Sequence, residues 1–507
     1  MITSNNKRIF KNIGLLFFRH FILTIAGFLS VRILLNTLGI ESFGVYSVVF
    51  GLVSFASFLS SGMFTSTQRY IAFSLGKKDQ RSLQKIYSIN LLIYAGLSIV
   101  IFLILETLGL WFIKNILTIS QDKIKIAIIV YQLLIFSFIS SLFITPFAAI
   151  ITAHENMRVF SYISLIEAFL KLGSAIALTI VPSEKLIMYA IFMLFASVIT
   201  TLIYIIVCKK IYPKFNFKAN SIDKSTFLNI ISFSGWSIFG QFTTIARNQG
   251  VIILLNQFFN PAIVASRVIS ASLANQINSF SHNLNVGLNP PIIKTYSANK
   301  KKEMYSLLIW GSKLSFFMTW VIALPLFLEM EVFINFWLVT PPPEIIYFSR
   351  LALIEAVIMS ISMPLASAAR APGKMRGYEL SLGTIQLLIF FISWILFVYG
   401  FPVESVFIIA IIASIFMFFA RLIITSNLVG IRILYYLKNV VVPVLTIFLL
   451  SGLFSIVIKK WLSPSLMTSF KIILLSIIIS IICMFFLGLD KILKDLIKEK
   501  FKKNFNR

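Results

Sequence analysis

Long apolar runs without a charged side chain set the strongest limit on how this chain can fold. Residues 126–150, 186–208, 380–403 and 440–458 contain no Asp, Glu, Lys or Arg. Each run is about as long as the 20 helical residues that cross a bilayer core of about 30 Å. Of the 507 residues, 58% are hydrophobic and only 12% are charged, which excludes a soluble domain, a disordered chain and a coiled coil. We therefore predict an all-α integral membrane protein.

These runs, together with more polar segments of similar length, predict fourteen transmembrane helices. The predicted spans are 13–36, 43–64, 86–109, 126–150, 159–180, 186–207, 228–257, 261–287, 305–328, 346–369, 378–400, 404–428, 439–458 and 467–489.

The distribution of basic residues supports this count and predicts the orientation. If the N-terminus is cytoplasmic, thirty of the 45 Lys and Arg residues fall in cytoplasmic segments, six in outer segments and nine within spans. Such a bias in short loops is the positive-inside signal, so both termini are predicted to be cytoplasmic. The net charge of +27 is spread over eight cytoplasmic segments beside apolar runs. It therefore indicates contact with anionic membrane lipids and no binding of nucleic acid.

The chain also contains an internal duplication. Residues 33–36 (ILLN) recur as 253–256, a shift of 220. Residues 146–158 match 364–376 at a shift of 218, with Pro, two Ala, Met and Arg identical. An offset of six spans keeps the two copies in the same orientation, so we predict two pseudo-symmetric six-helix bundles of a carrier.

This duplication predicts five parts of the chain. They are an N-terminal six-helix bundle (1–207), a lysine-rich cytoplasmic linker (208–226), a C-terminal six-helix bundle (227–429), two additional transmembrane helices (430–489) and a basic cytoplasmic tail (490–507). The tail alternates apolar residues with lysines, which is typical of an amphipathic helix on the inner leaflet.

Basic residues inside the predicted spans are the main functional signal. Each costs roughly 2.5–3.5 kcal/mol at a helix centre on insertion scales. Near span ends, long side chains can snorkel to the interface, and we expect this of Arg19, Arg350, Arg421 and Lys471. The remaining five exceed the available acids, and we predict that they line a hydrated cationic cavity that accepts an anion. They are Arg32, Lys171, Arg247, Arg267 and Lys313.

Only two carboxylates lie well inside spans. Glu167 stands four residues before Lys171, on the same helix face, and Glu355 lies within the tenth span. Two interpretations stay open: an internal ion pair that eases membrane insertion, or carboxylates that couple transport to an H+ or Na+ gradient.

Spans seven and eight carry amides and hydroxyls at helical spacing. Amides facing lipid would be costly, so these residues either bond neighbouring helices or line a solvated, sugar-binding face. The predicted lining consists of Gln241, Thr244, Asn248, Asn275, Asn278, His282 and Asn285.

The two cysteines and three histidines show no metal-ligand spacing, so we expect neither a metal nor another cofactor.

The arrangement of six, six and two spans, the repeat, and the stretch Arg32-Ile-Leu-Leu-Asn-Thr-Leu-Gly39-Ile-Glu-Ser-Phe-Gly44-Val-Tyr46 resemble the polysaccharide flippases. These are the O-antigen exporters of the multidrug/oligosaccharidyl-lipid/polysaccharide superfamily. The resemblance implies transport of an undecaprenyl-pyrophosphate-linked glycan for O-antigen, lipopolysaccharide or other polysaccharide biosynthesis across a bacterial inner membrane. Polysaccharide polymerase and chain-length machinery are the implied partners.

Three other functions are considered. A multidrug antiporter of the same superfamily should have an acidic site for organic cations, whereas the intramembrane balance here is basic. A peptidoglycan lipid-precursor flippase would share the diphosphate lipid and the cationic cavity. A membrane glycan polymerase or ligase usually needs a sizeable outer loop, and the longest outer segments here, 110–125 and 329–344, are short. We therefore expect a transporter and not an enzyme.

Overall fold

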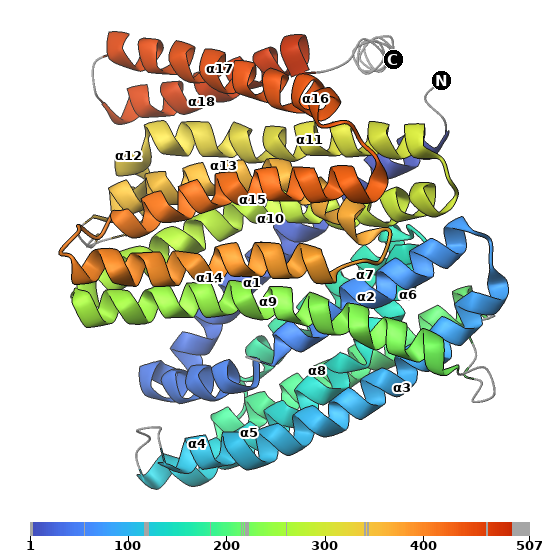
Figure 1. The fold of residues 1–507 in the computed structure, drawn as a ribbon. Helices are drawn as coiled ribbons and strands as arrows, with labels where there is room; N and C mark the ends of the chain where they lie inside the picture. The colour runs from blue at the N-terminus through green and yellow to red at the C-terminus, as the bar shows by residue number, and fades with distance from the viewer. Residues whose placement is uncertain are drawn as a thin grey trace, which may run out of the picture. The chain divides into compact units, whose positions relative to one another are not determined.

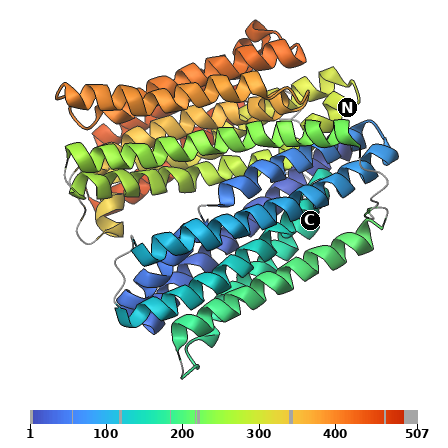
Figure 2. The same ribbon diagram turned by 60° about the horizontal axis from the view of Figure 1, so that its bottom comes forward.

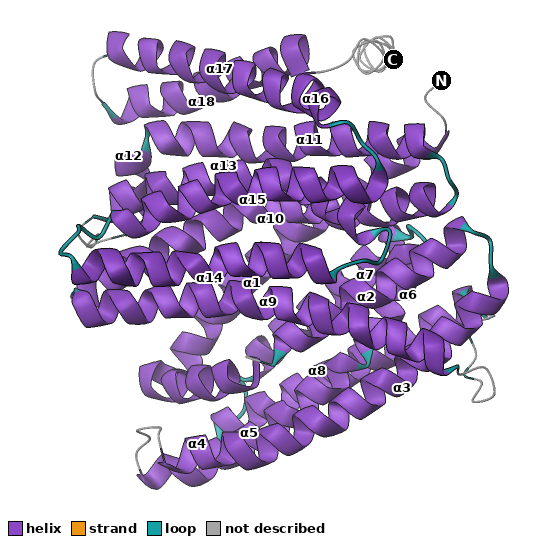
Figure 3. Ribbon diagram, in the orientation of Figure 1, coloured by secondary structure: helices purple, strands orange, loops and turns teal. Residues whose placement is uncertain are grey.

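The computed structural model describes residues 4–54, 56–115, 121–182, 184–213, 215, 217, 223–259, 261–338, 341, 344–462 and 465–488. Its described residues form helices joined by short loops, and none of them is in a β-strand (Figures 1 and 3). The predicted all-α fold class is therefore confirmed. The predicted basic tail from residue 490 lies outside the described residues.

The chain divides into two compact units, which we describe separately. The N-terminal unit contains residues 9–241, and the C-terminal unit contains residues 242–507 together with 1–8. The boundary falls within helix α9 (Lys224–Phe258). The predicted division into five parts stays a prediction.

Helices α1 to α8 belong to the N-terminal unit, apart from the first residues of α1. They are α1 (Ser4–Ser54), α2 (Ser57–Gly76), α3 (Gln80–Ile104), the π-helical turn η1 (Leu105–Gly109), α4 (Leu110–Asn115), α5 (Gln121–Leu142), α6 (Ile144–Ala153), α7 (Met157–Ala177) and α8 (Lys185–Ile211). Helix α5 packs along α8, and α7 packs on the other side of α8.

The C-terminal unit is built around α13 (Ile345–Arg370), which contacts α10, α11 and α15. Figures 1 and 2 show the long helices α10, α11, α13, α14 and α15 running along nearly one direction, while the short helix α12 does not follow it. The remaining elements are α10 (Pro261–Ser297), α11 (Lys301–Leu328), α12 (Met330–Trp337), α14 (Arg376–Val398), α15 (Ser405–Val429), α16 (Ile433–Tyr436), η3 (Leu437–Val441), α17 (Val442–Trp461), α18 (Leu466–Cys483) and η4 (Met484–Gly488).

Eleven helical segments of the described chain are long and apolar enough to cross a membrane. They correspond to the predicted spans apart from the first, the seventh and the eighth. Those three lie in α1, α9 and α10. In α9 and α10, polar and charged residues such as Arg247 and Asn275 lower the hydropathy, whereas the described part of α1 contains the shorter apolar stretch Gly14–Gly27.

The predicted turn between the first two spans, near residues 37–42, is wrong. Helix α1 continues through it to Ser54, and α2 extends to Gly76. The second span was predicted to end at residue 64, and polar residues follow it on α2. The structure buries them: Thr67 donates to Asn90 Oδ1 at 2.8 Å, and Gln68 donates to Thr152 Oγ1 at 3.0 Å. Because these partners replace water, the polar stretch remains helical inside the bundle.

Local geometry at two pairs of turns supports the internal duplication. The left-handed residues Glu155 (φ 61°) and Gly373 (φ 84°) are 218 positions apart, at matching places in the two copies of the Pro-to-Arg motif. Lys78 (φ 59°) and Asn299 (φ 58°) are 221 apart, and each lies in the turn after a long helix. Because positive φ is uncommon outside glycine, the pair Lys78 and Asn299 supports a repeat near this offset, and the duplication itself stays a prediction.

Candidate functional site

Four helices of the C-terminal unit bring the central charged residues of the predicted site together. Arg247 Nη1 on α9 donates to Glu355 Oε1 on α13 at 3.0 Å. Asn248 Oδ1 accepts from Arg247 Nε and Nη2 at 3.3 and 3.2 Å. Arg267 on α10 places its guanidinium 4.9 Å from the ring centre of Phe407 on α15. We call Arg247, Arg267 and Glu355 the C-terminal charge cluster.

The cluster carries one more positive than negative charge. Arg267 interacts electrostatically with both Glu355 and Arg247, so one carboxylate serves two guanidinium groups. The side chains of Arg247 and Glu355 are only 13% and 14% exposed. Charges withdrawn from water in this way are costly unless they are paired. Because pairing here is incomplete, the cluster favours an additional anion.

The sequence did not indicate which of the five cations meets Glu355. The structure pairs Glu355 with Arg247, 108 positions away, so spacing along one helix could not indicate the contact. Asn248 was predicted to line a solvated face, and the structure shows it fixing the guanidinium of Arg247 instead.

Helix α10 presents a polar face to the surroundings. Its exposed positions include Ser272, Asn275, Gln276 and His282. Lipid-facing helices of the same unit look different: α14 exposes Leu388, Phe391, Ile392 and Ile395 instead. Exposed amides cannot be satisfied by hydrocarbon, so this face of α10 is suited to water and to a polar ligand. The predicted lining residues Asn275 and His282 belong to it.

Other predicted lining residues are buried or half-buried in the structure. Asn285 is buried and donates to Ser281 O at 2.8 Å and to Ser315 Oγ on α11 at 3.3 Å, so it bonds two helices together. Asn278 is half-buried, and its Oδ1 has no hydrogen-bond partner among the described residues. Gln241 and Thr244 are half-buried on α9.

Two other cations predicted for the cavity, Lys313 and Arg32, are not part of the C-terminal charge cluster. Lys313 is only 4% exposed within α11, so its ammonium does not lie on an open face. Arg32 lies in α1, but its side chain is outside the described residues, and its predicted role stays a prediction.

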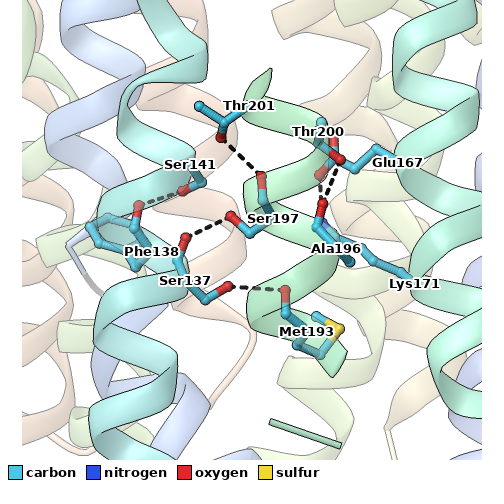
Figure 4. A network of polar contacts seen from close by, with 10 residues as sticks. All are labelled: Ser137, Phe138, Ser141, Glu167, Lys171, Met193, Ala196, Ser197, Thr200 and Thr201. Carbon is cyan, nitrogen blue, oxygen red and sulfur yellow. Dashed lines mark hydrogen bonds and ion pairs between the residues drawn. The ribbon is translucent and has the colours of Figure 1, made fainter. Parts of the chain in front are cut away.

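The N-terminal unit contains the predicted pair of Glu167 and Lys171 on α7. Lys171 Nζ lies 2.6 Å from Glu167 Oε1. Figure 4 shows both side chains beside Ala196 and Thr200 of α8. This confirms the predicted i, i+4 ion pair; its possible coupling role stays a prediction.

The same view shows a hydroxyl seam that the sequence reading missed. Ser197 donates to Ser137 O at 2.8 Å, which ties α8 to α5 (Figure 4). Thr201 adds a second link by donating to Ser140 O at 2.9 Å. Ser and Thr residues spaced three positions apart on α5 and four apart on α8 are the signal that would have indicated it.

Arginines expected to snorkel are instead held by neighbouring helices. Arg421 donates to Ser362 Oγ at 2.7 Å, Arg350 to Phe327 O at 3.2 Å, and Arg19 to Ser164 Oγ at 3.4 Å. Each of these three arginines therefore has an interhelical hydrogen-bond partner, while the Nε atoms of Arg19 and Arg421 have none among the described residues. Among the described residues, no group of three or more His, Cys, Asp or Glu side chains is arranged to hold a metal ion.

Comparison with known proteins is consistent with this geometry. The profile of a family described as "Polysaccharide biosynthesis protein" matches residues 9–280. No curated protein matches the sequence.

Solved structures with a similar fold are MATE transporters. A crystal structure of MATE in the straight conformation has a TM-score of 0.72 and 14% identity, covering 84% of this chain and 97% of that chain. An outward-facing multidrug resistance MATE transporter of the MOP superfamily has a TM-score of 0.71 and 14% identity, covering 85% and 96%. A mutant of a Vibrio cholerae MATE transporter has a TM-score of 0.66 and 15% identity, covering 85% and 98%. At these identities the likeness concerns the fold.

Proposed function

The chain belongs to the polysaccharide biosynthesis protein family and has a MATE-like transporter fold, and from this we propose that it is a lipid-linked oligosaccharide flippase. Its substrate is an undecaprenyl-pyrophosphate-linked repeat unit of O-antigen or another exported polysaccharide. The protein moves this lipid from the inner to the outer leaflet of a bacterial inner membrane by alternating access, with both termini in the cytoplasm. Family and fold are those of membrane transporters, not enzymes.

The observation that carries this proposal is the excess positive charge of the C-terminal charge cluster. Arginine binds phosphate oxygens through paired N–H donors, and such charge-assisted bonds are stronger than neutral ones. Arg247 and Arg267 supply two guanidinium groups, whereas Glu355 supplies one resident carboxylate. A diphosphate completes the pairing that the protein leaves unfinished.

The glycan and the lipid tail have separate requirements. The exposed polar side chains of α10, with Asn275 and His282 among them, provide hydrogen bonds for sugar hydroxyls. The polyprenyl tail needs only hydrocarbon, which surrounds the apolar faces of the other helices. The three parts of the substrate thus have three different surroundings: the diphosphate contacts the C-terminal charge cluster, the glycan contacts the polar face of α10, and the tail stays in lipid.

Glu355 has a specific role in this mechanism. An arriving diphosphate competes with the carboxylate for Arg247, and Glu355 then becomes available to a proton or Na+. Return of Glu355 to Arg247 promotes release of the phosphate. Such an exchange links the substrate to an H+ or Na+ gradient, and Glu167 on α7 is the second carboxylate available for coupling. The flippase delivers its cargo to polysaccharide polymerase and chain-length machinery.

Export of organic cations is the second candidate, because the solved structures with a similar fold include a multidrug resistance transporter. A peptidoglycan lipid precursor carries the same diphosphate and is the third. The net positive cluster favours a phosphate-bearing lipid over an organic cation. Competition between farnesyl diphosphate and a cationic dye for the purified protein distinguishes these ligand classes.

The test replaces Arg247 with alanine in a strain that lacks its own flippase. We expect surface glycan to fall at least tenfold at equal protein level, and Arg247→Lys to restore only part of it. The control is Arg432→Ala, which removes an exposed arginine at the start of α16 and should leave the amount of surface glycan unchanged. Full surface glycan in the Arg247→Ala strain contradicts the proposal.

A further inference from the structure

Glu379 carries a buried carboxyl group to which the proposed flippase mechanism assigns no role. It lies in the first turn of α14 and is only 7% exposed. Its carboxyl group interacts electrostatically with Arg370 on α13 and Arg421 on α15, but it forms no hydrogen bond or ion pair among the described residues. By contrast, Glu167 and Glu355 form ion pairs at 2.6 and 3.0 Å. Glu379 is therefore the exception among these three carboxyl groups.

Arg421 has neutral partners although a carboxyl group lies near it. Its Nη1 donates to Ser362 Oγ on α13 at 2.7 Å, and its guanidinium interacts with the phenol of Tyr378 on α14. Its Nε is buried and has no hydrogen-bond partner among the described residues. Arg421 is also the only charged residue of α15. The one charge of α15 is thus bound to a hydroxyl of α13 and not to the carboxyl group of α14.

This arrangement fits a protonated Glu379. A buried carboxylate is costly unless it is paired and hydrogen-bonded, so an unpaired one binds a proton instead. An ionised Glu379 would attract Arg421, because a bond between guanidinium and carboxylate is stronger than a bond to a neutral hydroxyl. The contact of Arg421 with Ser362 therefore indicates that Glu379 is neutral in this conformation.

We propose that Glu379 is a proton-binding residue of the transport cycle, whose ionisation moves Arg421 from Ser362 to the carboxylate. The proton passes to water, and a contact between α15 and α13 is replaced by one between α15 and α14. The inference that this exchange drives transport rests on the proposed function. It adds to Glu355 and Glu167 a carboxyl group that needs no substrate to release it from an ion pair.

The exchange at Arg421 acts on the helices that build the C-terminal charge cluster. Ser362 follows Glu355 by seven residues on α13, which is about 10 Å and nearly the same helix face. The ring of Phe407, which lies 4.9 Å from the guanidinium carbon of Arg267, belongs to α15. The cluster therefore spans α13 and α15, and a shift between these two helices changes its geometry.

Glu379 is also close to water at one membrane surface. It lies three residues, or about 4.5 Å, from the start of α14 at Arg376, which is exposed. The preceding loop, residues 371–375, is predicted to be cytoplasmic. The charged and titratable groups that interact with Glu379 are Arg370, Arg421 and the phenol of Tyr378. A proton thus has a short path between Glu379 and the cytoplasm.

Infrared spectroscopy of the full chain in phosphatidylcholine nanodiscs tests whether Glu379 is protonated. Exposed glutamates are ionised at neutral pH, so a carboxylic-acid C=O band at that pH reports a buried, protonated group. We expect such a band, shifted when the glutamates carry ¹³C in the side-chain carboxyl group. Glu379→Gln should abolish it, whereas Glu331→Gln, which removes an exposed carboxylate of α12, should leave it unchanged. Absence of the band, or its persistence in Glu379→Gln, overturns the proposal.

A second variant keeps Glu379 in place and tests the role of Arg421. A nearby cation favours the ionised carboxylate, so Arg421→Gln should raise the pH midpoint at which the band disappears by about one unit or more. Arg432→Gln removes an exposed arginine of α16 and should not shift the midpoint. An unchanged or lower midpoint in Arg421→Gln overturns the proposed exchange.

The coupling role is tested in the strain that lacks its own flippase. We expect Glu379→Gln to lower surface glycan at least tenfold at equal protein level, and to bind farnesyl diphosphate within twofold of wild type in nanodiscs, since Arg247 and Arg267 are unchanged. Full surface glycan in Glu379→Gln overturns the coupling role, and loss of binding assigns Glu379 a structural role instead. Full surface glycan in Arg247→Ala contradicts the proposed function but leaves the infrared results unaffected.

Discussion

Replacing Glu355 with glutamine tests the ion pair at the centre of the C-terminal charge cluster. The two charges lie close together: Arg247 Nη1 is 3.0 Å from Glu355 Oε1, and both side chains are mostly buried. With charge centres about 4 Å apart and an effective dielectric constant of 20, their attraction is about 4 kcal/mol. Removing one partner of a fully buried pair costs about 3–5 kcal/mol, because the other charge stays buried and unpaired. Allowing for the partial exposure here, we expect Glu355→Gln to lower the free energy of unfolding by about 2–4 kcal/mol.

The assay is a double-mutant cycle of Glu355→Gln, Arg247→Gln and the combined variant, measured by equilibrium unfolding in mixed micelles. The combined variant should be less destabilised than the two single variants added together, with a coupling of at least about 1 kcal/mol. Glu303→Gln is the control, because its ion pair with Lys300 is more than half exposed and should contribute about 0.5 kcal/mol or less. Strict additivity, or a Glu355→Gln protein as stable as the wild type, would refute the reasoning.

Three other predictions concern packing and helix ends. Gly109→Ala would push its methyl group into the Tyr131 hydroxyl, so we expect a loss of about 1–3 kcal/mol and a lower melting temperature. Asn285→Leu removes the bond to Ser315 and should cost about 0.6–1.7 kcal/mol in unfolding assays, without changing ligand affinity. Hydrogen bonds from neighbouring Ser and Thr residues lower the pKa of Asp223 to about 2. Its stabilisation of α9 is therefore complete above about pH 4 and is lost as the pH falls toward 2, and the difference in melting temperature between wild type and Asp223→Ala should shrink over that range.

The polar residues of α2 show where a pattern alone fails. Thr67 and Gln68 lie beyond residue 64, where the second span was predicted to end, and unpartnered polar groups inside a membrane would be costly. Their actual partners, Asn90 and Thr152, lie 23 and 84 residues away. Whether a polar stretch can be buried depends on hydrogen-bond partners on other helices, and the hydropathy of the stretch does not reveal those partners.

Arg247 and Arg267 illustrate the corresponding limit for the site. Both were predicted as functional cations because a charge within an apolar span is costly, and this inference needs only the residue and its span. The carboxylate shared between them, the aromatic ring of Phe407 under Arg267, and the contact of Arg19 with Ser164 involve residues far apart in the chain. These contacts changed the expected picture from free cations to partly compensated clusters.

The amino-acid sequence alone determined that this protein is helical and lies in a membrane that it crosses many times, and it predicts fourteen crossings and a duplicated bundle. A bilayer requires each spanning segment to be apolar and internally hydrogen-bonded, so these properties can be inferred from the composition and length of the apolar segments. Only the tertiary structure decided which cations meet a carboxylate, which amides bond helices and which stay accessible. Those outcomes depend on how each helix is rotated and packed, and packing is a property of side chains brought together from distant parts of the chain.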